Sequence, residues 1–532
     1  MKKLCAGLVL ACIGSGLLAN DSAGKITSHT FFSARPHFQS ASPEKEMFFR
    51  SDRLTAFEDG WGTAIQVVGF GGKSTESCDL ARFFMPFGKT ELIVAEGEVA
   101  DEATLQGDLD RSKDIEARHF NIQSDSTING FRSKIKFAPE QKFIGVGVDI
   151  RQVLMRCDDN NPLLWLEVSF PVEQIKNKMH LSEKIDPQFQ ALDIAMSTAP
   201  GLDGAPQVPN MIAAFKQSNW KYGKIDNKRC HSDWKIADVE AKMNWTNYRS
   251  DCCKFESYVG FVAPTGTKID RKHAAYVFTP VIGNNHHWGA MLGSHMKFDL
   301  WQHHNHHLAV VYDMDARYLF ENYQVRSFDL LGKQWSRYMA VYTPESQAAL
   351  AAETPGALGV DSGTSGINVF TKCVKVKPYY SATFNTALTY KYCNFIGELG
   401  YNFYVRHQEK VFLKHGAWKE SVALKALNGQ GNTSMARTIQ KNFIGSNIAN
   451  DPAVGGTGET GFQETTIKYR DLDLNSAAHP AVFSNIIYGG LGYEWHVCDI
   501  PMFAGVGGSY EFSSINTAIN HWTVWGKLGI SL

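Results

Sequence analysis

Histidines form the densest cluster of chemically active side chains in this sequence. The pairs His303-His304 and His306-His307 are separated by one residue, and His286-His287 lies shortly before them. Imidazoles at this density can bind transition metals or titrate together near pH 6. The alternative is a polar turn that needs only solubility and tight geometry. Because no cysteine or carboxylate lies beside the cluster to complete a closed site, we expect no metal and no cofactor.

A second set of residues has the side chains of a hydrolase. Ser476 and His479 lie three positions apart, and Asp471 precedes them. A serine hydrolase needs a nucleophile, a base and an acid that orients the base. The spacing here matches no arrangement that identifies a site, so we expect no enzyme and keep a membrane-bound hydrolase as a lesser alternative.

The largest set of candidate residues is charged and occurs at alternate positions of otherwise apolar stretches. Alternation places such side chains on one face of a strand, and in a barrel this would be the lumen face. Carboxylates outnumber basic groups, which predicts a weak cation preference if the lumen is open. The alternative is that the charges pair between strands and brace a plugged lumen. The predicted lumen-lining residues are Asp149, Arg151, Glu240, Lys242, Lys297, Asp299, Asp313, Asp315, Arg317, Glu398, Arg406, Glu494, Glu511 and Lys527.

The first residues have the pattern of an export signal. Met1-Lys2-Lys3 is a basic head, an apolar run follows it, and small or polar residues follow Ala19. This order predicts a signal peptide over residues 1–19, in a run too short to cross a bilayer as a helix. An alternative is a lipoprotein signal in which Cys12 is the modified residue.

Composition restricts the class of the exported protein. The 53 basic and 54 acidic residues nearly balance, so nothing points to a nucleic-acid partner. No later stretch is long and apolar enough for a membrane helix, whereas glycine (46) and phenylalanine (33) are plentiful. This combination suits a soluble β protein or a transmembrane barrel.

Alternation over long segments favours the barrel. In the last segment Trp522, Val524 and Leu528 fall on one face, and Thr523 and Lys527 fall on the other. Soluble sandwiches seldom keep such alternation over ten to fifteen residues with aromatic residues at the ends. The pattern recurs in residues 144–151, 237–245, 287–300, 307–318, 381–392, 395–406 and 502–512.

The connections between these segments alternate in length. Tight turns are predicted near residues 248–251, 302–305, 393–394 and 497–500, whereas residues 73–113, 171–233, 264–285, 331–371 and 408–480 form long connections. Outer-membrane barrels have short periplasmic turns and long external loops. We therefore predict an all-β fold with a single antiparallel transmembrane β-barrel of about 14 strands over residues 62–532, with 12 and 16 as alternatives. The main ambiguity is residues 323–342, which form either a strand continuing above the membrane or an extra pair within it.

For two features of the chain, the residue pattern leaves the structure open. Residues 20–61 show no clear strand alternation and are interpreted as either a plug in the lumen or a periplasmic arm. Eight cysteines lie beyond the signal, and an oxidising compartment permits disulfides. By the topology, Cys157, Cys252, Cys253, Cys393 and Cys498 lie on the short-turn side, and Cys78, Cys230 and Cys373 lie on the other.

Three local features resemble known barrels. The final alternating strand is similar to that of Gram-negative outer-membrane barrels, although these usually end in Phe or Trp and this chain ends in Leu532. A proline-initiated helical pattern over residues 209–218 and the turn Pro264-Thr265-Gly266 resemble long-chain fatty-acid transporters and related hydrocarbon channels. The resemblance implies an outer-membrane location, with outer-membrane lipids, lipopolysaccharide and the barrel-assembly machinery as partners.

The function expected from these patterns depends on the barrel. We expect an outer-membrane, porin-like channel or transporter for small solutes or hydrophobic compounds. An alternative is a surface antigen or adhesin that binds through its long loops. The transported compound and the oligomeric state stay open.

Overall fold

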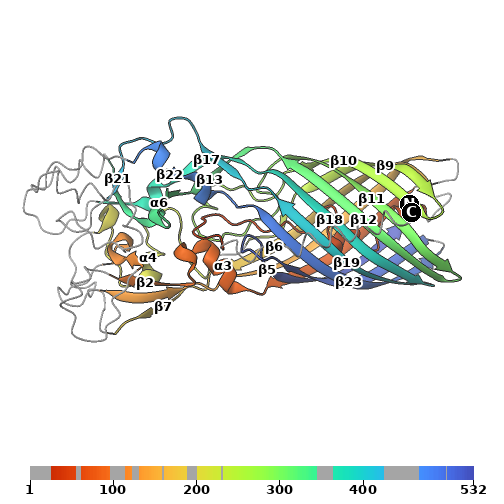
Figure 1. The fold of residues 1–532 in the computed structure, drawn as a ribbon, viewed down its shortest axis with the longest axis horizontal. Coiled ribbons are helices and arrows are strands. Elements are labelled where there is room, and N and C mark those ends of the chain that lie inside the picture. Colours follow the sequence, from red (N-terminus) through yellow and green to blue (C-terminus); the bar gives the residue numbers. More distant parts are fainter. Residues whose placement is uncertain are drawn as a thin grey trace, which may run out of the picture.

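The computed structural model describes most of the chain (Figure 1). It covers residues 25–55, 62–95, 114–122, 131–157, 161–187, 201–228, 232–343, 363–424, 467–498 and 500–532. The predicted signal peptide, the alternative lipid-modified Cys12 and Cys230 lie outside the described residues.

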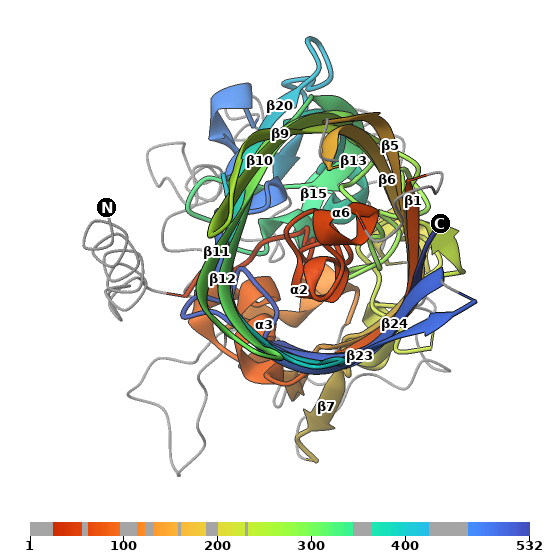
Figure 2. The same cartoon turned by 90° about the vertical axis from the view of Figure 1, so that its right-hand side faces the viewer.

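Twelve antiparallel strands form a closed ring (Figure 2). The first strand of the ring pairs with the last, with Ala64 opposite Ser531 and Lys73 opposite Trp522. On its other side the first strand pairs with β5, which closes the hydrogen bonding. A short strand, β8 (Lys235–Ile236), pairs with β6 outside the ring. The ring strands are β1 (Thr63–Ser74), β5 (Glu140–Arg156), β6 (Pro162–Lys178), β9 (Val239–Ser250), β10 (Cys253–Ala263), β11 (Gly289–His303), β12 (His306–Leu319), β18 (Tyr379–Tyr392), β19 (Phe395–Arg406), β23 (Val482–Val497), β24 (Ile500–Phe512) and β25 (His521–Ser531).

The all-β barrel is confirmed; about 14 strands are not, and the ring has the 12 strands expected as an alternative. The ambiguous stretch does not add a hairpin to the ring. Its strand β13 (Asn322–Ser327) pairs with β17 (Thr371–Lys377), which pairs with β20 (Lys410–Leu413), in a separate sheet. These strands therefore extend the wall beyond the ring. Their side chains still alternate between two faces, although the strands no longer pair with the strands of the ring.

The predicted faces of the strands are confirmed by burial. In β25 the Leu528 side chain is 61% exposed, whereas its neighbour Lys527 is 3% exposed. In β18, Ser381, Thr383 and Asn385 are buried and the intervening side chains face outward. A strand in a closed ring has one face inside and one outside, so local alternation alone sets this orientation.

Aromatic residues lie near both ends of the apolar outer face. In β18 the outward residues run from Tyr380 to Tyr390, with Ala382, Phe384 and Leu388 between them. Ten residue steps at ~3.4 Å per residue, tilted by ~40°, give a band about 26 Å high. This height matches the apolar band of ~25 Å that outer-membrane barrels present to lipid.

The two ends of the barrel differ. One end carries short turns, at residues 251–252, 304–305 and 393–394. His304, Cys393 and Cys498 occupy the left-handed region, with φ of 51°, 50° and 49°, as tight hairpin turns require. Five of the seven described cysteines lie at this end, and all seven are unpaired (Cys78, Cys157, Cys252, Cys253, Cys373, Cys393, Cys498).

The other end carries a folded cap built from the long connections (Figure 1). It contains the helix α3 (Ser77–Phe84), the short helices α4 (Met211–Ala214) and α6 (Gly366–Val369), and four small sheets. Among the described residues no helix has both the length and the apolar character needed to cross a membrane. Besides β13, β17 and β20, the sheets contain β2 (Glu91–Ala95), β3 (Ile115–Glu116), β4 (Arg132–Lys136), β7 (Ser182–Ile185), β14 (Asp329–Leu330), β15 (Ala340–Tyr342), β16 (Thr364–Ser365), β21 (Ala423–Leu424) and β22 (Leu472–Asp473).

The cap has its own hydrophobic core. Phe120, Phe215, Trp220, Trp335 and Tyr338 are buried and contact one another through their rings. Such aromatic packing contributes ~0.5–1.5 kcal/mol per pair beyond area burial. The described parts of the long connections therefore form a packed layer over one barrel end.

We predict that the outer face contacts lipid, which makes position 528 sensitive to charge. Leu528→Arg should reduce stability by roughly 2–4 kcal/mol because the charge would lie in the hydrocarbon region. The control Leu528→Met keeps an apolar side chain and should assemble normally. Assembly is measured as the faster migration of unheated protein on a detergent gel. Equal assembly of both variants would contradict a lipid-facing position.

Candidate functional site: the N-terminal segment inside the barrel

Residues 25–55, here called the plug segment, pass from the cap into the barrel lumen. Near its start the segment hydrogen-bonds to the cap, from His29 N to Phe83 O and from Thr30 N to Ser476 O. Further along, the short helix α2 (Pro43–Glu46) and the 3₁₀ turn η1 (Ser51–Thr55) follow. Viewed from the short-turn end, α2 lies within the ring of strands (Figure 2). The segment therefore fills the lumen.

Apolar side chains of the plug segment fit recesses made by wall glycines. A Cβ atom on Gly147 would lie 2.5 Å from the Phe38 ring, and one on Gly490 would lie 2.7 Å from Met47 Sδ. Both distances are shorter than real contacts allow, so only glycine admits these side chains there. Phe38 and Met47 are fully buried. These recesses fix the height of the plug segment in the barrel.

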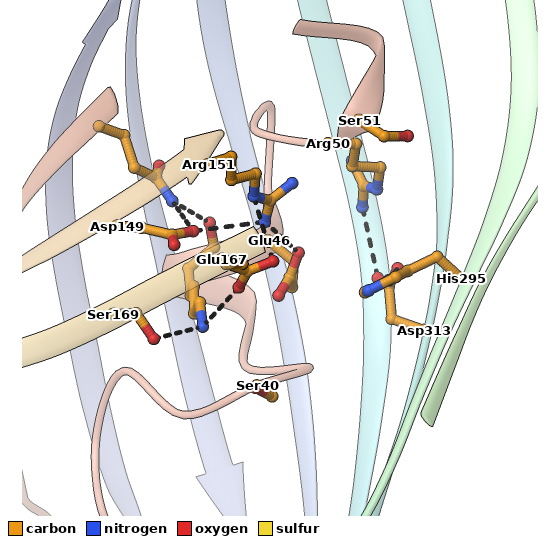
Figure 3. Close-up of polar contacts among 12 residues, drawn as sticks. Ser40, Glu46, Arg50, Ser51, Asp149, Arg151, Glu167, Ser169, His295 and Asp313 are labelled. Atoms are coloured by element: carbon orange, nitrogen blue, oxygen red, sulfur yellow. Dashed lines mark hydrogen bonds and ion pairs between the residues drawn. The ribbon is translucent and has the colours of Figure 1, made fainter. Parts of the chain in front are cut away.

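The helix α2 brings Lys45 and Glu46 to the wall. Figure 3 shows Glu46 beside Arg151 and Glu167. Lys45 Nζ lies 2.9 Å from Glu167 and 3.8 Å from Glu240, and it donates a 2.7 Å hydrogen bond to Ser169 Oγ. The backbone N–H and hydroxyl of Ser40 also donate to Glu240, at 3.0 and 2.7 Å. Pro43 at the first turn of α2 preorganises the helix start, since its fixed φ suits that position. One cation thus links the plug segment to β6 and β9.

The adjacent glutamate makes the complementary contact. Glu46 accepts from Arg151 Nη2 at 3.2 Å, and Arg151 also lies 3.3 Å from Asp149 and from Glu167. All four side chains are buried. Because a buried charge without a partner costs several kcal/mol, each side chain in this group depends on the others.

Arg50 connects the plug segment to another part of the wall (Figure 3). Its two terminal nitrogens donate to the two oxygens of Glu398, at 2.9 and 2.8 Å, and Nη2 lies 3.6 Å from Asp313. Asp313 also accepts from Asn385 at 2.9 Å and contacts His295 at 2.9 Å. The two-point contact with Glu398 adds geometric specificity to the charge interaction.

The end of the plug segment is held near the short-turn mouth. Asp52 lies 3.0 Å from Lys297 and 3.7 Å from Lys254, and Arg53 pairs with Glu494. Glu494 also lies 2.6 Å from Lys391. The plug segment is therefore bound to several strands of the ring by ion pairs. In some of them the plug segment supplies the cation, and in others it supplies the anion.

Backbone carbonyls of the plug segment are also bound by the wall. Lys527 donates to the carbonyls of Met47 (2.6 Å) and Lys45 (3.2 Å), and Arg406 donates to that of Ser33 (3.0 Å). These contacts supply partners for backbone groups that a non-regular segment leaves unpaired inside the barrel.

The structure places all fourteen predicted residues on the inward side or at its ends, and it divides them into two sets. Eight contact the plug segment: Arg151, Glu240, Lys297, Asp313, Glu398, Arg406, Glu494 and Lys527. Six contact other wall residues, namely Asp149, Lys242, Asp299, Asp315, Arg317 and Glu511. Whether any of them lines a passage stays a prediction, since the plug segment occupies the space between them.

Sequence reasoning did not identify the charged residues of the plug segment itself. Lys45, Glu46, Arg50, Asp52 and Arg53 are the partners of the wall charges. A usable signal was present, because these alternating charges interrupt an aromatic stretch and so must find partners if that stretch is buried.

A vestibule lies between the plug segment and the short-turn mouth. Its volume is about 640 Å³, and Phe48, Arg50 and Arg53 line it on the plug side. A small void of about 20 Å³ is lined by Glu46, Arg50 and Arg151. The void beside the plug segment has room for about one water molecule, whereas the vestibule is far larger.

Three of the clustered histidines line this vestibule. His304, His306 and His307 border it, and His307 contacts Asp299 at 2.8 Å. His306 contacts the Tyr390 hydroxyl at 2.7 Å. In the described part of the chain no group of three or more His, Cys, Asp or Glu side chains is arranged to hold a metal ion.

The residues proposed for hydrolysis have separate partners. Ser476 Oγ donates to Asp473 O at 2.7 Å, and the His479 ring lies 2.7 Å from Arg406. Burial, followed by the charge of Arg406, holds the pKa of His479 well below its usual range. A ring that resists protonation is a poor general base near neutral pH. This geometry gives no support to a Ser476–His479 catalytic pair.

Comparisons with known proteins locate outer-membrane barrels. No protein-family model and no curated protein matches the chain. Among solved structures, an outer-membrane channel of Pseudomonas putida F1 matches at 8% identity and TM-score 0.36, over 88% of this chain and 95% of its own. The Pseudomonas putida toluene transporter TodX matches at 7% and 0.28, over 95% and 97%. A Pseudomonas aeruginosa FadL homologue matches at 7% and 0.23, over 96% and 99%. These values are too low to transfer a substrate or a mechanism.

The Arg50–Glu398 contact predicts how firmly the plug segment is held. Arg50→Gln leaves Glu398 and Asp313 without their cation, which should cost about 3 kcal/mol. The amides of Met47 and Phe49, which donate within the plug segment, should then exchange hydrogen roughly 100-fold faster.

Two further variants serve as controls for this prediction. Adding Glu398→Gln to Arg50→Gln should recover part of the loss, because no unpaired carboxylate then remains at that position. Lys73→Gln breaks the exposed Lys73–Glu140 pair outside the lumen and should leave both amides protected. Unchanged exchange in Arg50→Gln would show that this pair does not anchor the plug segment.

Proposed function

We propose that this protein is an outer-membrane channel for small polar solutes, in which displacement of the plug segment opens the passage. The observation that carries the proposal is the nature of the plug–wall interface. It combines ion pairs and hydrogen bonds to single side chains with apolar packing, in which Phe38 and Phe49 stack on Phe70 and Phe503 of the wall. The polar contacts can be exchanged for contacts with water and solute when the segment moves, and the apolar contacts limit how often it does so.

The chemistry of the lumen favours polar over hydrophobic solutes. Glu167, Glu240 and Arg151 face the space that the plug segment occupies, and carboxylates and guanidinium groups bind water and polar solutes. A hydrophobic compound would leave these groups desolvated. The vestibule of about 640 Å³ gives a solute room to approach the plug from the short-turn side.

A membrane location is consistent with the outer surface. The band about 26 Å high is apolar and bordered by aromatic residues, as expected for strands that cross the hydrocarbon core. With the short turns in the periplasm, the cap would face outward.

The cap favours a second function, recognition of a partner at the cell surface. Its packed core holds exposed apolar side chains such as Leu331 and Tyr469 in place on the outside. An adhesin or antigen would use this surface and need no open lumen. This function would be supported if substitution of these two residues abolished binding to the partner at the cell surface and left permeability unchanged.

Channel activity is tested by loosening the plug segment. In planar bilayers, wild-type protein should conduct rarely, and Lys45→Met/Arg50→Gln should raise the open fraction at least about tenfold, since each change removes a buried cation. Proteoliposomes with the same variant should swell in small sugars or amino acids. Lys73→Gln should behave as wild type.

The result that would refute the channel is specific. If hydrogen exchange shows the plug segment displaced in Lys45→Met/Arg50→Gln and conductance still does not appear, the barrel does not form a passage. The cap would then be the functional part of the protein.

A further inference from the structure

The outer face of the sheet β13–β17–β20 presents lysines directly beyond the aromatic border of the barrel. Lys375 lies opposite Tyr323 and Phe412, and Lys377 lies opposite Lys410 in the sheet register. Tyr323, Phe412 and Lys410 are exposed, and about a third of each of the other two lysine side chains is exposed. We call Lys375, Lys377 and Lys410 the lysine strip.

The charges of the lysine strip are only partly neutralised. Glu321 pairs with Lys375 and lies 3.4 Å from Lys377. Among the described residues Lys410 forms no ion pair with an acid. Its Nζ lies 5.5 Å from the centroid of the Tyr379 ring. Lys377 lies 5.9 Å from the same ring. Lys375 and Lys377 thus share one carboxylate, and Lys410 has none within ion-pair distance among the described residues.

The position of the lysine strip indicates which anion would reach it. Trp288, Tyr318, Phe320 and Tyr380 are exposed on the outer face where the ring strands end. Tyr318 is opposite Tyr380, and Phe320 N donates to Trp288 O at 2.8 Å, so these rings form a contiguous border. Aromatic borders of this kind lie at the level of lipid headgroups.

The distance from this border to the lysines is short. Lys377 is two residues and Lys375 four residues from Tyr379, the first residue of β18. At ~3.4 Å per residue the backbone of both lysines lies within about 14 Å of the border along the strand. This is the zone in which phosphate groups of lipid headgroups lie, and lysine binds phosphate as a point charge.

We infer that the lysine strip binds the phosphate groups of membrane lipid headgroups, such as those of lipopolysaccharide, on the cap side of the barrel. The inference rests on the proposed membrane location but not on channel activity. The aromatic residues Tyr323 and Phe412 contact the lipid beside the phosphates. This binding anchors one side of the barrel at the headgroup level, below the cap.

The test uses the purified mature protein in detergent, with native mass spectrometry to count bound lipids. The probes are diphosphorylated lipid A and phosphatidylcholine. Wild type should bind the first in preference to the second. Lys375→Gln/Lys377→Gln/Lys410→Gln should lower the affinity for lipid A by about 10- to 100-fold, since each lysine near an anionic surface adds attraction. Unheated migration on a detergent gel confirms that the variant is assembled.

Two matched variants make the test decisive. Glu321→Gln removes the one neutralising carboxylate and should strengthen lipid A binding. Lys73→Gln/Lys142→Gln removes two outward lysines at the same barrel end that both pair with Glu140, and should change binding less than about twofold. If the triple variant keeps its affinity, if phosphatidylcholine binds equally, or if inorganic phosphate displaces the lipid, the inference is wrong. Conductance is measured separately, so loss of lipid binding with normal channel opening leaves the proposed function intact.

Discussion

A charge inside a closed barrel must have a partner, and this constraint links the plug segment to the wall. Lys45 and Arg50 bring positive charge to Glu167, Glu240, Glu398 and Asp313, and Glu46 brings negative charge to Arg151. Each of these groups would be costly to bury alone. Without the plug segment, water would have to solvate the charged side chains of the wall. Without the wall, the plug segment would lack the partners that stabilise its conformation.

The apolar and ionic contacts of the plug segment have different roles. Phe38 and Met47 fill recesses that only glycine can provide, so they determine where the segment sits. The ion pairs determine which way it faces, because both signs must meet their opposites on particular strands. A segment positioned by shape and oriented by ion pairs has one defined place in the lumen.

The outside of the barrel is organised by the same period of two. Side chains such as Leu528 that alternate with lumen-facing charges form the apolar band, and aromatic residues border it. Beyond that border the wall continues as β13, β17 and β20, and there the outward side chains become charged. An order from apolar to aromatic to basic is the one expected where a wall passes from hydrocarbon to lipid headgroups.

The sequence by itself determined the barrel class, the faces of its strands and the positions of its turns, because a period of two and a tight turn are local properties. It correctly placed Lys527 inside and Leu528 outside from neighbouring residues alone. Only the tertiary structure decided the number of strands and the partners of the charges. Residues 322–327 alternate like a barrel strand, yet they pair beyond the ring, since ring membership depends on strands far away in the chain. Likewise Arg50 and Glu398 are separated by several hundred residues, and no local pattern records that closing the barrel brings them together.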